Sequence, residues 1–141
     1  MFRTILVPVD LTELDISKGA IEAACELALA SGGSVRLVNV QSLLPATFMD
    51  YVPADFDTAQ KQRAEAEMAE VAAKVPLPKE RVSTKVRIGG IYPEILAEAE
   101  EFGADLIVIG SHRPAMSTFL LGSNAKTVVR HATCSVLVVR H

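Results

Sequence analysis

The chain has 141 residues, half of them hydrophobic, and its 17 acidic and 14 basic residues give a formal net charge of −3 at pH 7. This length predicts one domain over residues 1–141, and the charge gives no reason to expect a nucleic acid or an anionic membrane as a partner. With no apolar run near the roughly 20 residues of a membrane span, no signal-peptide pattern and only two distant cysteines, we expect a cytoplasmic protein without a metal site or disulfides.

The first half of the chain predicts two buried strands, each followed by a helix. Both strands are rich in apolar residues, which is typical of strands in a sheet that helices cover on both faces. Gly32 and Gly33 end the first helix, and Pro76 ends the second. The predicted elements are a strand over 4–9, a helix over 15–30, a strand over 34–40, a long irregular connection over 41–56 and a helix over 57–75.

The second half continues this alternation of strands and helices. Residues 82–88 alternate between two faces, and Ser83, Lys85 and Arg87 make one of these faces more polar. Gly103 ends the helix that follows. The predicted elements are a strand over 82–88, a helix over 92–102, a strand over 105–109, a helix over 125–132 and a strand over 135–140.

Strict alternation of strands and helices predicts an α/β fold with a five-stranded parallel sheet and right-handed crossovers. In an open doubly wound sheet, ligands bind beyond the carboxyl ends of the strands, at the point where the strand order reverses. Asp10 follows the first strand and Gly110 follows the fourth. We therefore expect these two residues to border one shared crevice.

The connection after the fourth strand points to an anion site. Gly110 follows the apolar strand 105–109, and the sequence Gly-Ser-Asn over 122–124 opens the last helix. A helix N-terminus has free backbone N–H groups and a partial positive charge, so it is a common place for a phosphate. The segment 110–124 therefore predicts a nucleotide site.

Over essentially its whole length the chain resembles the universal stress protein family. Residues 5–10 (Ile-Leu-Val-Pro-Val-Asp) are similar to the opening strand of the family and its acidic residue, and residues 89–95 to its third, glycine-containing turn. The C-terminal third is the most specific part. Residues 111–114 (Ser-His-Arg-Pro), 120–124 (Leu-Leu-Gly-Ser-Asn) and 130–132 (Arg-His-Ala) resemble the short F/G branch of the enterobacterial members.

This resemblance implies a Rossmann-like doubly wound sheet with helices on both faces, and a small dimeric ATP-binding protein of stress adaptation. The end of the first strand would line the adenosine, with Asp10 reaching the ribose hydroxyls, and the backbone of Val40 would pair with adenine. The end of the fourth strand and the start of the last helix would border the ribose and hold the phosphates. The residues that the resemblance places around ATP, with or without Mg²⁺, are Pro8, Val9, Asp10, Val40, Ile109, Gly110, His112, Arg113, Gly122, Ser123 and Asn124.

The chain departs from the ATP-binding members of the family at one position of the phosphate loop. Those members carry a second glycine three positions after the first, where this chain has Arg113, and the spacing to Gly122 is one residue shorter. A side chain here limits the close approach of the backbone to a ligand, although a guanidinium is itself a strong donor to phosphate.

Several of these polar residues also have an ordinary structural interpretation. Asp10 is equally suited to cap the first helix, and Ser123 and Asn124 to cap the last. The acidic residues after position 97, Glu98, Glu100 and Glu101, have no partner that suggests acid–base chemistry, and we interpret them as a solvated face. No catalytic residue and no metal ligand is predicted.

Three functions are compatible with these residues. The first is an ATP-binding regulatory protein with little or no hydrolysis, because no positioned nucleophile, general base or Mg²⁺-binding carboxylate pair can be named. The second is a slow ATPase or a protein that phosphorylates or adenylylates itself. The third is a nucleotide-free homodimeric interaction module.

The last strand indicates how a second copy would bind. Residues Val136–Val139 are apolar and lie at the end of the chain. A bare apolar edge strand favours aggregation unless it is covered. Pairing with the same strand of a second copy would cover it and give a two-fold homodimer.

Overall fold

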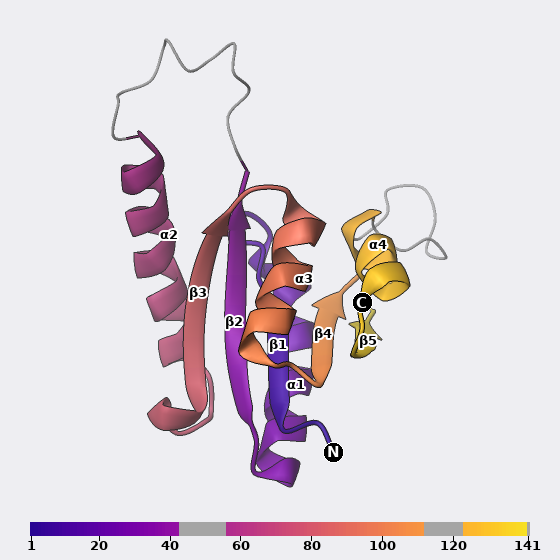
Figure 1. Ribbon diagram of the computed structural model, residues 1–141. Helices are drawn as coiled ribbons and strands as arrows, with labels where there is room; N and C mark the ends of the chain where they lie inside the picture. Colours follow the sequence, from indigo (N-terminus) through magenta and orange to yellow (C-terminus); the bar gives the residue numbers. More distant parts are fainter. Residues whose placement is uncertain (43–55, 112–122, 141) are drawn as a thin grey trace.

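The computed structural model (Figure 1) describes residues 1–42, 56–111 and 123–140, and it has the predicted fold class. The predicted irregular connection therefore lies mostly outside the described residues. Strands and helices alternate as expected, and most bounds differ from the predicted ones by one or two residues. The elements are β1 (Thr4–Pro8), α1 (Leu14–Ser31), β2 (Ser34–Gln41), α2 (Phe56–Ala73), a 3-10 turn (Lys79–Arg81), β3 (Val82–Ile88), α3 (Ile91–Phe102), β4 (Leu106–Gly110), α4 (Ser123–His131) and β5 (Ser135–Val139).

The five strands form one parallel sheet in the order β3-β2-β1-β4-β5. The chain builds outward from β1 to β3 and then crosses back to the other side of β1, where β4 and β5 are added (Figure 1). The strand order therefore reverses between β1 and β4. This reversal places the ends of β1 and β4 next to each other, which is where a ligand crevice is expected.

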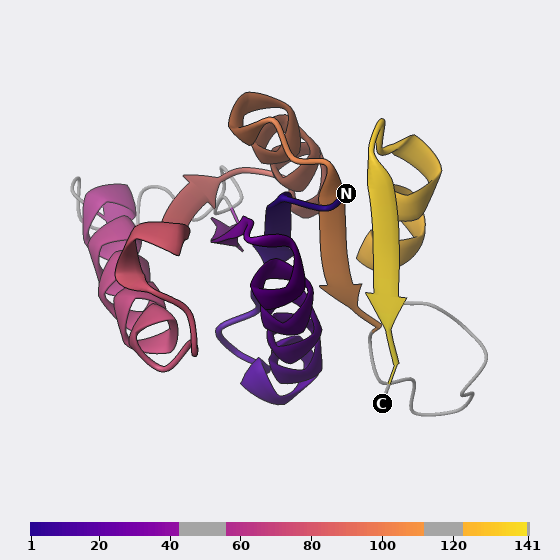
Figure 2. The same cartoon turned by 90° about the horizontal axis from the view of Figure 1, so that it is seen from below.

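Helices cover both faces of the sheet, with α1 and α2 on one side and α3 and α4 on the other (Figure 2). Strand β1 shows why its sequence is continuously apolar. Successive side chains of a strand point to opposite faces, so Ile5 and Val7 pack beneath α1 while Leu6 packs with α3 and α4. None of these three side chains is exposed to solvent. Burial on both faces explains why these positions of β1 are all apolar.

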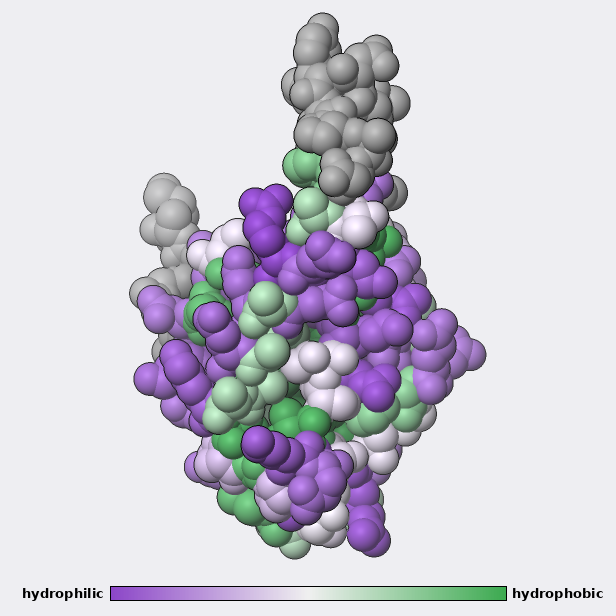
Figure 3. Space-filling model, turned by 90° about the vertical axis from the view of Figure 1, so that its left-hand side faces the viewer, coloured by the Kyte–Doolittle hydropathy of each residue, from purple (hydrophilic) through white to green (hydrophobic). Residues whose placement is uncertain are grey.

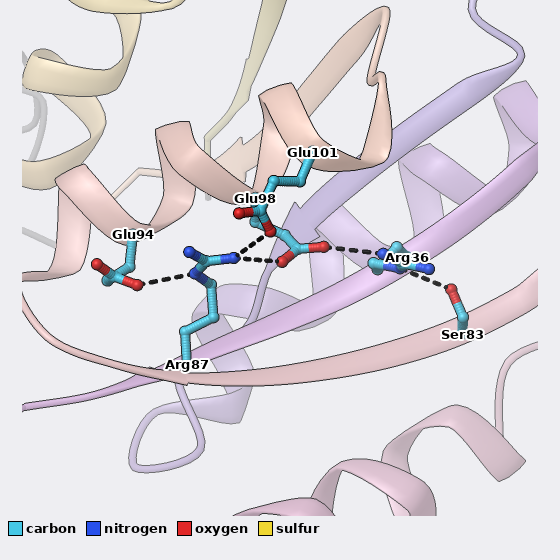
Figure 4. A network of polar contacts seen from close by, with 6 residues as sticks. All are labelled: Arg36, Ser83, Arg87, Glu94, Glu98 and Glu101. Atoms are coloured by element: carbon cyan, nitrogen blue, oxygen red, sulfur yellow. Dashed lines mark hydrogen bonds and ion pairs between the residues drawn. The ribbon is translucent and has the colours of Figure 1, made fainter.

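Glu98 corrects the interpretation of the acidic group on α3 as a solvated face. Glu100 and Glu101 are exposed, but Glu98 is only 1% exposed. Its carboxylate accepts hydrogen bonds from Arg36 Nη1 of β2 at 2.9 Å and from Arg87 Nη1 of β3 at 2.8 Å (Figure 4). The polar face of β3 therefore lies against the carboxylates of α3. Sequence alone does not reveal the partners of Glu98, because Arg36 is 62 positions away from it along the chain.

The two arginines have further partners that hold them in this network. Arg87 also donates to Glu94 and Glu101, at 2.8 Å each, and the contact with Glu94 contributes most to raising the pKa of Arg87 above its ordinary value. Arg36 donates from Nε to Ser83 Oγ at 3.0 Å, and its guanidinium carbon lies 4.3 Å from the ring centroid of Phe102. The network joins β2, β3 and α3 on one face of the sheet.

The surface on the α2 and β3 side is mainly hydrophilic, with a narrower band of apolar residues (Figure 3). This agrees with the composition of α2, which buries only Ala64 and Met68. In the described parts of the chain, no helix is both long and apolar enough to cross a membrane.

Candidate functional site

A cavity of about 590 Å³ lies at the carboxyl ends of β1, β2 and β4, at the reversal of strand order. Its volume falls in the range of roughly 300–1,000 Å³ that is typical of small-molecule sites. The strands supply its floor, and the first turns of α1, α3 and α4 contribute to its walls. Seven of the residues predicted to surround a nucleotide line it: Pro8, Val9, Asp10, Val40, Ile109, Gly110 and Asn124.

The other predicted site residues cannot be placed around this cavity. His112, Arg113 and Gly122 lie outside the described residues. Ser123 is the first residue of α4, and its side chain is also outside the described part of the chain. The assignment of all eleven residues to nucleotide binding stays a prediction.

Gly110 allows β4 and α1 to approach each other beside the cavity. A Cβ atom at this position would lie 2.5 Å from the carbonyl oxygen of Ile16 and 3.1 Å from its Cγ2. No residue with a side chain could be accommodated at position 110 without moving the backbone of α1. A glycine is therefore required here for packing, whatever ligand the cavity holds.

Asp10 does not cap α1, so the alternative interpretation of this residue is wrong. The N-cap of α1 is Glu13, and no side chain caps the helix there. Asp10 Oδ1 instead accepts hydrogen bonds from Thr12, from the backbone N–H at 2.9 Å and from Oγ1 at 2.6 Å. The backbone N–H of Asp10 donates to Ser17 Oγ at 3.0 Å. These bonds orient the carboxylate, and within the described residues no donor contacts its second oxygen, Oδ2.

The lining of the cavity combines an apolar wall with polar residues. Val40, Ile95 and Ile109 form an apolar wall that is continuous with the core beneath α3 and α4. The lining also includes polar side chains, among them Asp10 and Ser17. Asn124 lies in the first turn of α4, where the helix has no acidic residue and carries its partial positive charge. Such a cavity suits a molecule with a flat apolar part, hydroxyl groups and an anionic end.

Sequence reasoning missed three carboxamides that line the cavity. Asn39 Nδ2 donates to the Val9 carbonyl at 2.9 Å, Gln41 Nε2 donates to Asn39 Oδ1 at 2.5 Å, and Gln60 Nε2 donates to Gln41 Oε1 at 2.9 Å. A signal was present, because Asn39 is a polar residue within a buried strand, and a buried amide needs hydrogen-bond partners. Gln60 could not be found this way, since it belongs to the mainly exposed helix α2.

The described residues offer little for catalysis by a metal or a thiolate. Among them, no group of three or more His, Cys, Asp or Glu side chains could hold a metal ion. Both cysteines are free, and burial raises the pKa of the Cys25 thiol and of the Cys134 thiol, which disfavours the reactive thiolate.

A doubly wound α/β sheet with a cavity at the reversal of strand order is typical of a class of proteins that bind ligands at that place. Comparisons with known proteins identify the family. The model of the Universal stress protein family matches residues 1–140. Universal stress protein G of Escherichia coli O157:H7 is 36% identical over 143 aligned residues, which cover 99% of this chain and 100% of that protein. The chain belongs to the universal stress protein family. Its similarity to universal stress protein G is consistent with the predicted F/G type.

Solved structures show the same fold. Universal stress protein UspA from Lactobacillus plantarum superposes with a TM-score of 0.78 at 23% identity, covering 99% of both chains. A universal stress protein family member from Arabidopsis thaliana gives a TM-score of 0.63 at 20% identity, over 97% of this chain and 90% of that one. The predicted family and fold class are therefore confirmed.

Proposed function

We propose that this protein binds an adenine nucleotide, with ATP as the principal ligand, in the cavity between β1 and β4. It would act in the cytoplasm as a regulatory protein of stress adaptation, with little or no hydrolysis. The observation that carries the proposal is the combination, in one cavity, of an apolar wall, a carboxylate oxygen without a partner among the described residues, and a helix N-terminus. The Arabidopsis member of the family was solved with AMP bound, which supports this choice of ligand.

Each part of the nucleotide has a matching part of the cavity. The base would lie against the apolar wall near Val40, where the backbone at the end of β2 can pair with its edge. The ribose hydroxyls would donate to Asp10 Oδ2, which Thr12 holds in place through the other oxygen. The phosphates would lie at the start of α4 beside Asn124, because a helix N-terminus favours anions. Any Mg²⁺ would then be held mainly by phosphate oxygens.

Calorimetric titration with ATP, AMP and GTP tests the proposal. We expect saturable ATP binding with a dissociation constant below roughly 1 mM, and weaker binding of GTP. Mass analysis of the recovered protein and nucleotide should show unmodified protein and intact ATP. Hydrolysed ATP or a phosphorylated protein would instead favour the enzymatic alternative, and no binding at millimolar ATP would leave the nucleotide-free interaction module.

Replacing Asp10 by asparagine is expected to weaken ATP binding by about tenfold, because a hydrogen bond to a charged group contributes roughly 1.5–3 kcal/mol. The variant keeps Oδ1 for Thr12 and changes only the oxygen that would face the ribose. The measurement is titration with ATP and with 2′,3′-dideoxy-ATP, which lacks both hydroxyls.

The dideoxy nucleotide should bind the wild type and the Asp10→Asn variant about equally. The matched control is Asp15→Asn, an exposed aspartate in the first turn of α1, which should change neither affinity. Equal weakening of both nucleotides by Asp10→Asn would show that Asp10 does not bind the ribose.

We also propose a homodimer that forms through strand β5. This strand is one edge of the sheet, and Leu137 on it and Val129 on α4 are 39% and 45% exposed. A second copy pairing along Val136–Val139 would cover these apolar side chains.

A charge at Leu137 is expected to shift the protein from dimer to monomer, because the Leu137→Glu variant would bury two carboxylates in a two-fold interface. Sedimentation velocity at micromolar concentration measures the change. Leu29→Glu is the matched control, since Leu29 is 55% exposed and belongs to α1, not to β5 or α4. A wild type that is monomeric, or a Leu137→Glu variant that stays dimeric, would contradict this interface.

A further inference from the structure

Three carboxamides along the cavity wall form one hydrogen-bonded chain, and a single backbone group sets its direction. The carbonyl oxygen of Val9 can only accept, so the atom of Asn39 that lies 2.9 Å from it must be the amide nitrogen. Asn39 Oδ1 then faces Gln41, whose nitrogen donates to it. Gln41 Oε1 consequently faces Gln60 and accepts from its nitrogen. The orientation of all three amides therefore follows from the Val9 carbonyl.

The series of amides runs along the cavity from a buried residue to a half-buried one. Asn39 is only 4% exposed, whereas Gln60 is half-buried near the start of α2 and lines the cavity. Within the described residues, Gln60 Oε1 has no hydrogen-bond partner. Each amide polarises the next, so donation through nitrogen makes this terminal oxygen a stronger acceptor. Gln60 lines the cavity and is bonded to Gln41, the residue after Val40, so this acceptor would lie at the end where the base is proposed to bind.

We infer that Gln60 selects the base of the nucleotide by accepting a hydrogen bond from the 6-amino group of adenine, an inference that rests on the proposed function. Guanine and hypoxanthine carry an oxygen at this position, which accepts and cannot donate. An isolated glutamine could turn its amide over to donate to that oxygen. Gln60 cannot do so, because its own oxygen would then face Gln41 Oε1, another acceptor. The direction of these three hydrogen bonds would therefore make the site selective for adenine over 6-oxopurines.

A ligand without the amino group isolates this contact. Purine riboside triphosphate is ATP with hydrogen at C6, and inosine triphosphate has oxygen there. In the Gln60→Met variant, a side chain of similar length replaces the amide. We expect ATP to bind this variant about five- to tenfold more weakly than the wild type, and purine riboside triphosphate to change by less than about twofold. The matched control is Gln62→Met, an exposed glutamine on the same helix, which should change neither affinity.

A second variant tests whether the chain sets the direction of Gln60. Gln41→Met removes the acceptor that holds the Gln60 nitrogen, so the Gln60 amide becomes free to turn over. ATP binding should then fall by only about twofold to threefold, while the preference for ATP over inosine triphosphate should drop by about tenfold. A purely structural role of Gln41 would weaken both nucleotides equally. Thermal unfolding of each variant reports separately on whether the fold is kept.

The outcomes separate this inference from the proposed function. Absence of ATP binding by the wild type would overturn both. If the wild type binds ATP, two results overturn the inference alone. One is equal weakening of ATP and purine riboside triphosphate binding by Gln60→Met. The other is a preference for ATP over inosine triphosphate that Gln41→Met leaves unchanged. If Gln60→Met does not fold, the Gln41→Met comparison decides, and an unchanged preference in that variant overturns the inference.

Discussion

Replacing Glu98 by glutamine is expected to lower the free energy of unfolding by about 2–3 kcal/mol. Glu98 is almost fully buried and is the one carboxylate that contacts both Arg36 and Arg87 within the described residues. Removing one partner of a buried ion pair costs roughly 3–5 kcal/mol, because the other charge remains with its desolvation uncompensated. We expect a loss near or below the lower end of that range, because the Arg36 and Arg87 side chains are 28% and 16% exposed and water still solvates them in part. Urea unfolding followed by circular dichroism measures the difference.

Glu101 provides the matched control for this effect. It contacts the same nitrogen of Arg87 at the same distance of 2.8 Å, but its side chain is 63% exposed. A solvent-exposed ion pair contributes only about 0–1 kcal/mol, so Glu101→Gln should change stability by less than about 0.5 kcal/mol. Equal effects of Glu98→Gln and Glu101→Gln would show that burial does not decide the strength of these contacts.

Replacing Gly110 by alanine is expected to lower the free energy of unfolding by about 3 kcal/mol. The new Cβ would lie 2.5 Å from the carbonyl oxygen of Ile16, and a backbone atom cannot move aside as a flexible side chain can. Helix α1 would have to move away from β4, and overpacking of this kind typically costs roughly 1–3 kcal/mol or more. The same displacement would alter the cavity, so ATP binding should weaken as well. Chemical unfolding and ATP titration of the variant measure the two effects.

Gly19 offers a control of opposite sign. It lies within α1, and a Cβ there would meet Val139 Cγ1 at 3.4 Å, which is an ordinary contact. Alanine within a helix is more favourable than glycine by roughly 0.5–1 kcal/mol, so Gly19→Ala should stabilise the protein. A Gly110→Ala variant as stable as the wild type would mean that α1 can move away from β4 without loss of packing.

Much of the fold could be predicted from local patterns because each element is encoded by neighbouring residues. The apolar runs of β1 and β4 indicate strands buried on both faces, and Gly32 and Gly103 end α1 and α3 in the left-handed conformation that glycine readily adopts. Alternation of these elements implies a parallel sheet. Asp10 after β1 and Gly110 at the end of β4 then lie at the same edge of the sheet, as expected.

The contacts between distant residues could not be predicted in this way. Glu98 has the same local pattern as its exposed neighbours on α3, and only the packing of that helix over β2 and β3 brings it to two arginines. The role of Asp10 was also open, because a carboxylate after a strand is equally suited to cap a helix. The bonds from Thr12 and the start of α1 at Leu14 decide against the cap.

The amino-acid sequence by itself determined the family, the order of the elements and the edge of the sheet at which a ligand would bind. These depend on residue type and on spacing along the chain, which local sterics and hydrophobic periodicity convert directly into strands and helices. Only the tertiary structure decided that Glu98 is buried, that Gly110 touches α1, and that Gln60 completes a chain of amides at the cavity. Each of these depends on the distance between residues of different elements, and packing alone sets that distance.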